Sequence, residues 1–88
     1  MKIEVRKPVE TEIEEMNILS WPIWTCEPSE FDWCYDERET CFLLEGNVTV
    51  TMDSGSVSFG IGDLVIFPAG LSCRWKVNQT VRKHYKFG

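Results

Sequence analysis

The sequence lacks the features that mark several common classes of protein. It has a single histidine and no pair of cysteines separated by two residues, which argues against a structural zinc site. No apolar stretch is long enough to cross a membrane, and residues 1–8 alternate charged with apolar side chains instead of forming the apolar core of a secretion signal. We therefore expect a cytoplasmic protein whose four cysteines stay reduced.

The sequence also lacks an excess of positive charge. Nine Lys and Arg against fourteen Asp and Glu give a net charge of −5 and a pI of about 4.8. An acidic surface repels the phosphates of nucleic acids and the headgroups of anionic membranes, so we expect neither among the partners. With 88 residues the chain has room for one domain, residues 1–88, and its core is thin enough that self-association would help it.

Aromatic residues, in contrast, are abundant. Four Trp, five Phe and two Tyr suggest a core or a cavity filled by large flat side chains. Phe31, Trp33 and Tyr35 recur at every second position, the period of a strand with one aromatic face. Together with Trp24 and Trp75, the rings of Trp33 and Tyr35 could form a pocket for a flat or cationic ligand, and core packing explains them about as well.

Short strand patterns separated by polar turns run through most of the chain. Residues 48–52 alternate apolar with polar side chains, and residues 45–47 and 78–80 have the composition of turns. A threonine followed three residues later by glutamate has the pattern of a capping box and predicts a short helix over residues 11–17. Eight or nine short strands with almost no helix predict an all-β protein, an antiparallel sandwich or barrel.

Two spaced motifs suggest a family. The first joins Glu39 to Gly46, with six residues between them. The second contains, in order, Gly62, Pro68, Gly70 and Cys73. In this spacing the chain resembles the cupins, with cysteine where the second cupin motif has histidine. The stretches 44–50, 62–70, 74–77 and 81–85 are similar to the small cupin group related to the ureidoglycine aminohydrolase cupin domain.

The resemblance implies a fold and a broad role. The implied fold is a small antiparallel jelly-roll barrel with one short N-terminal helical turn. The implied assembly is a homodimer, and the implied ligand is a small nitrogenous or polar metabolite.

The resemblance also raises the question of a metal. A typical metal cupin holds its ion with two His and one Glu from the first motif and one His from the second, a mixed set that suits transition metals. The two His positions of the first motif fall on Asp32 and Cys34, or on Trp33 and Tyr35 if the following gap is one residue shorter. Neither alternative supplies a histidine. We therefore expect no metal cofactor of the usual cupin type.

Glu39 is the candidate catalytic residue, because the resemblance places it where a ligand would point into the barrel. It could act as a general base, as a ligand or as a hydrogen-bond acceptor for a substrate amine. It could also simply pair with Arg38, Arg74 or Lys83, or lie at the cavity mouth. The residues expected to contact substrate are Trp24, Trp33, Tyr35, Cys41, Cys73 and Trp75.

The cysteines have competing interpretations. Cys73 faces inward by its motif position, and Cys41, two residues after Glu39, shares the face of Glu39 on the same strand. Their thiols could bind a soft metal or act as nucleophiles, and inert thiols in the cavity wall are the simpler interpretation. His84 is expected on a solvated face with Arg82.

Two classes of function stay open at this point. One is an enzyme, a hydrolase or isomerase of a small metabolite, in which Glu39 is the acid or base. The other is a non-catalytic module that binds or senses a small molecule in the barrel. The retained glutamate favours the first, and the missing histidines favour the second.

Overall fold

Strands make up most of the chain in the computed structural model, which describes residues 1–88. In chain order the elements are β1 (Glu4–Arg6), α1 (Glu10–Glu15), the 3-10 turn η1 (Ile18–Ser20), β2 (Ile23–Cys26), β3 (Ser29–Cys34), β4 (Glu39–Met52), β5 (Gly55–Gly60), β6 (Leu64–Phe67) and β7 (Ser72–Phe87). All paired strands run antiparallel. The predicted all-β architecture with one short helix is confirmed.

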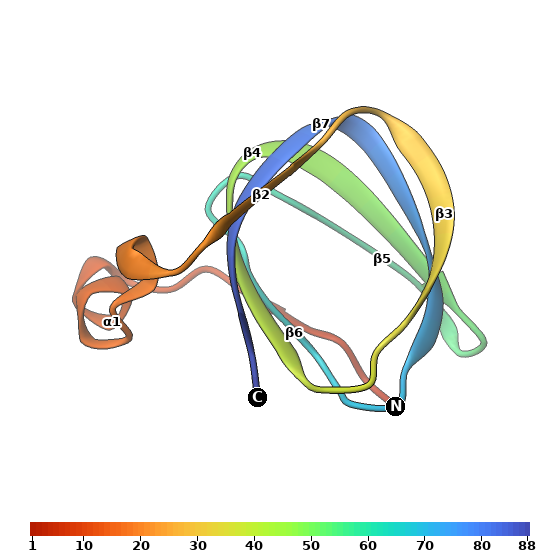
Figure 1. The fold of residues 1–88 in the computed structure, drawn as a ribbon, viewed down its shortest axis with the longest axis horizontal. Helices are drawn as coiled ribbons and strands as arrows, with labels where there is room; N and C mark the ends of the chain where they lie inside the picture. Colours follow the sequence, from red (N-terminus) through yellow and green to blue (C-terminus); the bar gives the residue numbers. More distant parts are fainter.

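The two long strands β4 and β7 form the centre of the sheet. They pair with each other, and the sheet continues on one side through β6 to β1 and on the other to β2. β3 adds to the first half of β7, and β5 adds to the second half of β4. Figure 1 shows the strands arching around a common interior, with α1 outside at one side of the barrel. Inward-facing side chains of β3, β4 and β7 therefore converge.

Two segments predicted as turns lie inside the long strands instead. Residues 45–47 and 78–80 belong to β4 and β7, and the pairing register shifts where they meet. Gly46 has a φ of 101°, and a Cβ placed on it would lie 2.5 Å from the Thr80 carbonyl oxygen. These irregularities bend a continuous strand, and they use the same small and polar residues as a turn does. The chain therefore has seven strands, fewer than the eight or nine predicted.

The helix is confirmed, but its predicted cap is wrong. α1 covers Glu10–Glu15, and Val9 occupies the N-cap position without a side-chain hydrogen bond. In the first turn of α1, Glu12 accepts a hydrogen bond from Arg6 Nη1 at 2.5 Å. Ile18, which is fully buried, anchors the following 3-10 turn to the barrel. No helix is long and apolar enough to span a membrane.

Phe67 joins the hydrophobic core to the aromatic interior. It is fully buried at the end of β6, within the cluster that also contains Leu43, Val50 and Val65. Its ring stacks on Tyr35 with centroids 4.8 Å apart and lies 5.6 Å from the Trp75 ring. The packed core therefore lies against the Tyr35 and Trp75 rings and fixes their positions.

The side chain of an aspartate holds the turn before β6. Asp63 Oδ2 accepts a hydrogen bond from the Gly60 N–H at 2.8 Å, and Lys7 Nζ lies 3.0 Å from its other oxygen. Gly62 adopts a φ of 82°, which a residue with a side chain would reach only with strain.

Candidate functional site

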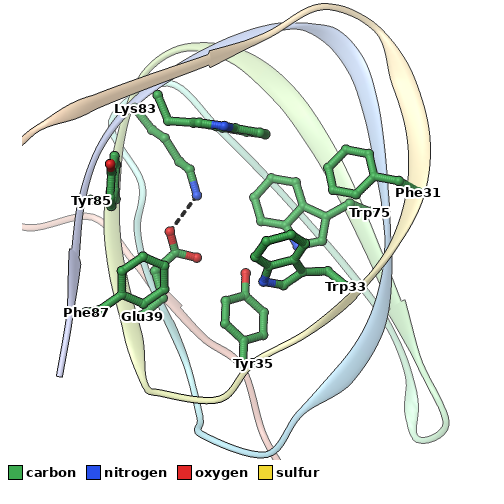
Figure 2. A pocket seen from close by; sticks show the side chains of 9 residues that line it. Phe31, Trp33, Tyr35, Glu39, Trp75, Lys83, Tyr85 and Phe87 are labelled. Carbon is green, nitrogen blue, oxygen red and sulfur yellow. Dashed lines mark hydrogen bonds and ion pairs between the residues drawn. The ribbon is translucent and has the colours of Figure 1, made fainter.

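A cavity of about 210 Å³ opens between the strands. Seven aromatic side chains and one pair of opposite charges line it: Trp24, Phe31, Trp33, Tyr35, Glu39, Trp75, Lys83, Tyr85 and Phe87 (Figure 2). Its volume is below the range of drug-sized pockets, so it suits a small metabolite.

The structure decides between the two alternatives for β3. Trp33 and Tyr35 line the cavity, whereas the Asp32 carboxylate faces the opposite side of the sheet and pairs with Arg74 at 2.8 Å. Cys34 is exposed. Because successive side chains of a strand alternate in direction, Phe31, two residues before Trp33, also points into the cavity.

A buried ion pair is the only charged feature of the cavity. Lys83 Nζ, from the second half of β7, lies 2.7 Å from Glu39 Oε2 at the start of β4. Both side chains are 5% exposed. Of the three partners considered for Glu39, Lys83 is the one it meets. Removing two charges from water costs free energy that their attraction only partly returns.

Two tryptophans surround the ammonium group. Lys83 Nζ lies 5.0 Å from the centroid of the Trp24 ring and 4.7 Å from that of the Trp75 ring. The negative faces of the rings attract the cation, and Glu39 supplies its hydrogen-bond acceptor. The remaining N–H groups of the ammonium have no acceptor within the protein.

Two neutral donors lie beside the ion pair. Tyr35 is 2% exposed, and burial together with the adjacent Glu39 carboxylate raises its pKa far above the ordinary value, so the phenol keeps its proton. The buried Nε1 of Trp75 has no hydrogen-bond partner. A buried donor without a partner is rare in folded proteins and is suited to an acceptor on a ligand. Figure 2 shows the Tyr35 hydroxyl directed toward the middle of the cavity.

The mouth of the cavity is aromatic as well. Trp33 and Phe87 line the cavity and are 47% and 44% exposed. Tyr85 meets Phe87 edge to face, with centroids 5.7 Å apart. Large half-exposed rings at an opening offer a flat contact surface to an entering molecule.

Comparison with known proteins identifies the family. The family model described as the EutQ-like cupin domain matches residues 13–85. The chain belongs to the EutQ-like cupin family. No curated protein matches this cupin.

Solved structures agree with this assignment. This cupin is 49% identical to tm1112, a DUF861-family protein from Thermotoga maritima, with a TM-score of 0.96 over 99% of this chain and 100% of that one. A DUF861 protein of unknown function from Pseudomonas syringae pv. tomato is 29% identical over 75% of this chain and 29% of its own, with a TM-score of 0.68. The EutQ protein of Clostridium difficile, 19% identical over 97% of this chain and 66% of that one, shares the fold with a TM-score of 0.69.

The residues at the usual cupin metal position do not fit a metal ion. Trp33 and Tyr35 occupy the places that the resemblance gives to the first two histidines, and Glu39 is bound to an ammonium group. Cys73 directs its thiol to the Trp33 carbonyl oxygen, 3.6 Å away. No group of three or more His, Cys, Asp or Glu side chains in this cupin is arranged to hold a metal.

Two of the predicted contact residues lie outside the cavity lining. Cys41 and Cys73 belong to the hydrophobic core, where they are 0% and 8% exposed. Burial raises the pKa of Cys41 to about 12 and that of Cys73 to about 11. Both thiols therefore remain protonated at neutral pH, which suits neither a nucleophile nor a ligand of a soft metal.

Sequence reasoning missed the importance of Lys83 and misplaced His84. The alternation of residues 81–87 puts Lys83, Tyr85 and Phe87 on one face, and this signal could have placed all three in the cavity. His84 faces the other way and is 5% exposed, and its Nδ1 lies 2.8 Å from the Trp21 carbonyl oxygen. The expected solvated face is covered there by the segment that precedes β2.

Proposed function

We propose that this cupin binds a small polar or nitrogenous metabolite in the aromatic cavity, and that Glu39, paired with Lys83, acts on it as an acid or base. The observation that carries the proposal is the buried ion pair on the cavity wall. The cytoplasmic location and the homodimer expected from the sequence belong to the same proposal.

The energetics of the pair favour a chemical role. A buried salt bridge is weak evidence for stability, because apolar residues of similar volume often stabilise a protein as well or better. Glu39 and Lys83 are both nearly inaccessible and surrounded by rings, so this cost applies to them. A role in the cavity therefore explains this pair better than a contribution to stability does.

The polar atoms of the cavity define the chemistry of the ligand. The charges of Glu39 and Lys83 cancel, so the site suits a neutral or zwitterionic molecule. Donors outnumber acceptors, because Lys83 has unused N–H groups and Trp75 Nε1 has no partner. A planar molecule with a carbonyl-type oxygen and an N–H group would satisfy these donors and give a hydrogen bond to Glu39 Oε1.

The resemblance to the ureidoglycine aminohydrolase cupin domain fits such a ligand, since ureides combine carbonyl and N–H groups. A proton can pass between Lys83 Nζ and Glu39 Oε2 over their 2.7 Å contact, which gives the site one acid and one base within reach of the ligand. Hydrolysis or isomerisation of a small nitrogenous compound is the reaction class that this pair supports best.

Binding without catalysis is the second candidate. It is favoured by Trp33 and Tyr35, which lie in the cavity where a metal cupin has the histidines that hold its ion. Turnover separates the two candidates, because both predict binding in the cavity and only the first predicts a product.

The test is binding and turnover by the wild type and by Glu39→Gln. A panel of small planar carbonyl compounds with N–H groups, hydantoin among them, is titrated against tryptophan fluorescence. Glutamine keeps an oxygen for Lys83, and circular dichroism checks the fold first. We expect binding to weaken by about 10- to 100-fold, the loss of one charged hydrogen bond.

The matched control is Glu30→Gln. Glu30 is an exposed glutamate whose pair with Arg74 lies outside the cavity, at 2.6 Å. This variant should bind as the wild type does. If Glu39→Gln left both binding and any turnover unchanged, the proposed role of Glu39 would be wrong.

A further inference from the structure

We infer that Lys83 is a covalent nucleophile whose ε-amino group forms a Schiff base with a small aldehyde or ketone. This inference rests on the function proposed above, because it assumes that the cavity admits a small carbonyl compound. It adds the substrate class and the atom that reacts.

The first observation in favour of this inference is the burial of Lys83. Lysine is almost never fully buried unless it is paired, and long lysine side chains normally extend their charged ends to water. Here the side chain is 5% exposed, and its nitrogen ends inside a cavity walled by Trp24 and Trp75. Lysines that form Schiff bases are typically desolvated in hydrophobic pockets of this kind.

Glu39 supplies the base that such a lysine needs. Its Oε2, 2.7 Å from Nζ, takes a proton from the ammonium, and the freed electron pair of the nitrogen attacks the carbonyl carbon. A C–N bond forms, the π electrons of the C=O bond move to oxygen, and a second nitrogen proton passes to that oxygen to give a neutral carbinolamine. Glu39 then returns its proton to the hydroxyl group.

The hydroxyl group leaves as water while the nitrogen lone pair forms the C=N bond. The net reaction converts an ammonium and a carbonyl into an iminium and water, with no oxidant or reductant. The iminium carries the same positive charge in the same place as the ammonium. The two tryptophan rings and the Glu39 carboxylate, which stabilise the lysine cation, would therefore stabilise the product.

The neutral donors complete the site. Charge develops on the carbonyl oxygen during attack, and buried donors placed near a developing charge lower the barrier. Trp75 Nε1 has no hydrogen-bond partner and is available to that oxygen, and the Tyr35 hydroxyl, which keeps its proton beside Glu39, can turn from that carboxylate to it. Propanal, which is neutral, matches the cancelled charges of the cavity and is the main carbonyl probe, whereas pyruvate is anionic and tests the effect of a net charge.

The experiment traps the imine by reduction. The full chain is incubated with propanal or with pyruvate and with sodium cyanoborohydride, and peptide mass mapping gives the rate at each lysine. We expect modification of Lys83 to saturate with probe concentration and to exceed that of Lys76, an exposed lysine on the same strand. Glu39→Gln should slow the labelling of Lys83 by about 10²-fold, the usual size of general acid–base catalysis.

Two variants keep the outcomes distinct. Lys83→Arg retains the charge but forms no imine, so saturable trapping should disappear, while Lys76→Arg should leave it intact. If hydantoin-type compounds bind but Lys83 is labelled no faster than Lys76, the nucleophile is refuted and the proposed function stands. If Glu39→Gln affects neither ligand binding nor labelling, the proposed function itself fails.

Discussion

The Glu39–Lys83 pair should cost the fold stability, and a double-mutant cycle can measure this. The two changes are Glu39→Leu and Lys83→Met, made singly and together. Each replacement removes one charge and keeps a side chain of similar volume. Because both partners are 5% exposed, neither charge can reach water after its partner is lost.

The expected magnitudes follow from burial. Removing one partner of a buried pair leaves an uncompensated charge and costs about 3–5 kcal/mol. That is a large share of the roughly 5–15 kcal/mol that stabilises a typical domain. Removing both charges leaves no buried charge. The free energy of unfolding of the double variant should therefore lie within about 1 kcal/mol of the wild-type value or above it. If the two changes acted independently, the double variant would instead lose the sum of the two single losses.

Urea unfolding at pH 7, followed by far-ultraviolet circular dichroism, gives the free energy and the m-value of each variant. The exposed Glu30–Arg74 pair is the control, since its atoms are as close, at 2.6 Å, but lie in solvent. Glu30→Gln should change stability little. A double variant as unstable as the sum of the singles would refute the reasoning, because the pair would then be a structural requirement and not a cost.

The remaining predictions concern the thiols and the strand irregularity. Burial raises the pKa of Cys73 from 9.0 to about 11, so its thiolate fraction at pH 8 falls by about 100-fold. Iodoacetamide should therefore label the exposed Cys34 first and should label Cys73 only as the pH approaches 11. Peptide mapping after labelling measures both reactions. Equal labelling of both at pH 8 would contradict this. Gly46→Ala should reduce the free energy of unfolding by about 1–3 kcal/mol and so lower the melting temperature. The new Cβ would lie 2.5 Å from the Thr80 carbonyl oxygen, and a φ of 101° is strained for alanine. An unchanged melting temperature would argue against this close approach.

Local patterns predicted the fold well because they report local geometry. The alternation around Trp33 and the short helix near residues 11–17 depend on residues a few positions apart. The strand count failed for the same reason. A glycine such as Gly46 followed by asparagine marks either a turn or an irregularity within a strand, and only the pairing of β4 with β7 decides which.

The site could be predicted only in part. Glu39 and four aromatic residues follow from motif position and strand period. Lys83 lies 44 residues from Glu39 in the sequence, and their contact depends on the register between two strands that each contain an irregularity. Cys41 has the inward direction that its spacing from Glu39 predicts, but direction alone does not distinguish the cavity wall from the core beneath it.

The ion pair also explains how a cupin barrel can hold a polar site without the histidines of the first motif. In a typical metal cupin a cation lies beside the glutamate of that motif. In this chain the Lys83 ammonium lies 2.7 Å from that glutamate, and Trp33 and Tyr35 replace the histidines that would bind a metal. The cavity keeps a positive charge next to the same carboxylate, but the charge now belongs to a side chain. A fixed ammonium cannot exchange ligands as a metal does, whereas it can give up a proton and react. The two proposals above, acid–base chemistry by Glu39 and an amine nucleophile at Lys83, both follow from this replacement of a metal ion by a side chain.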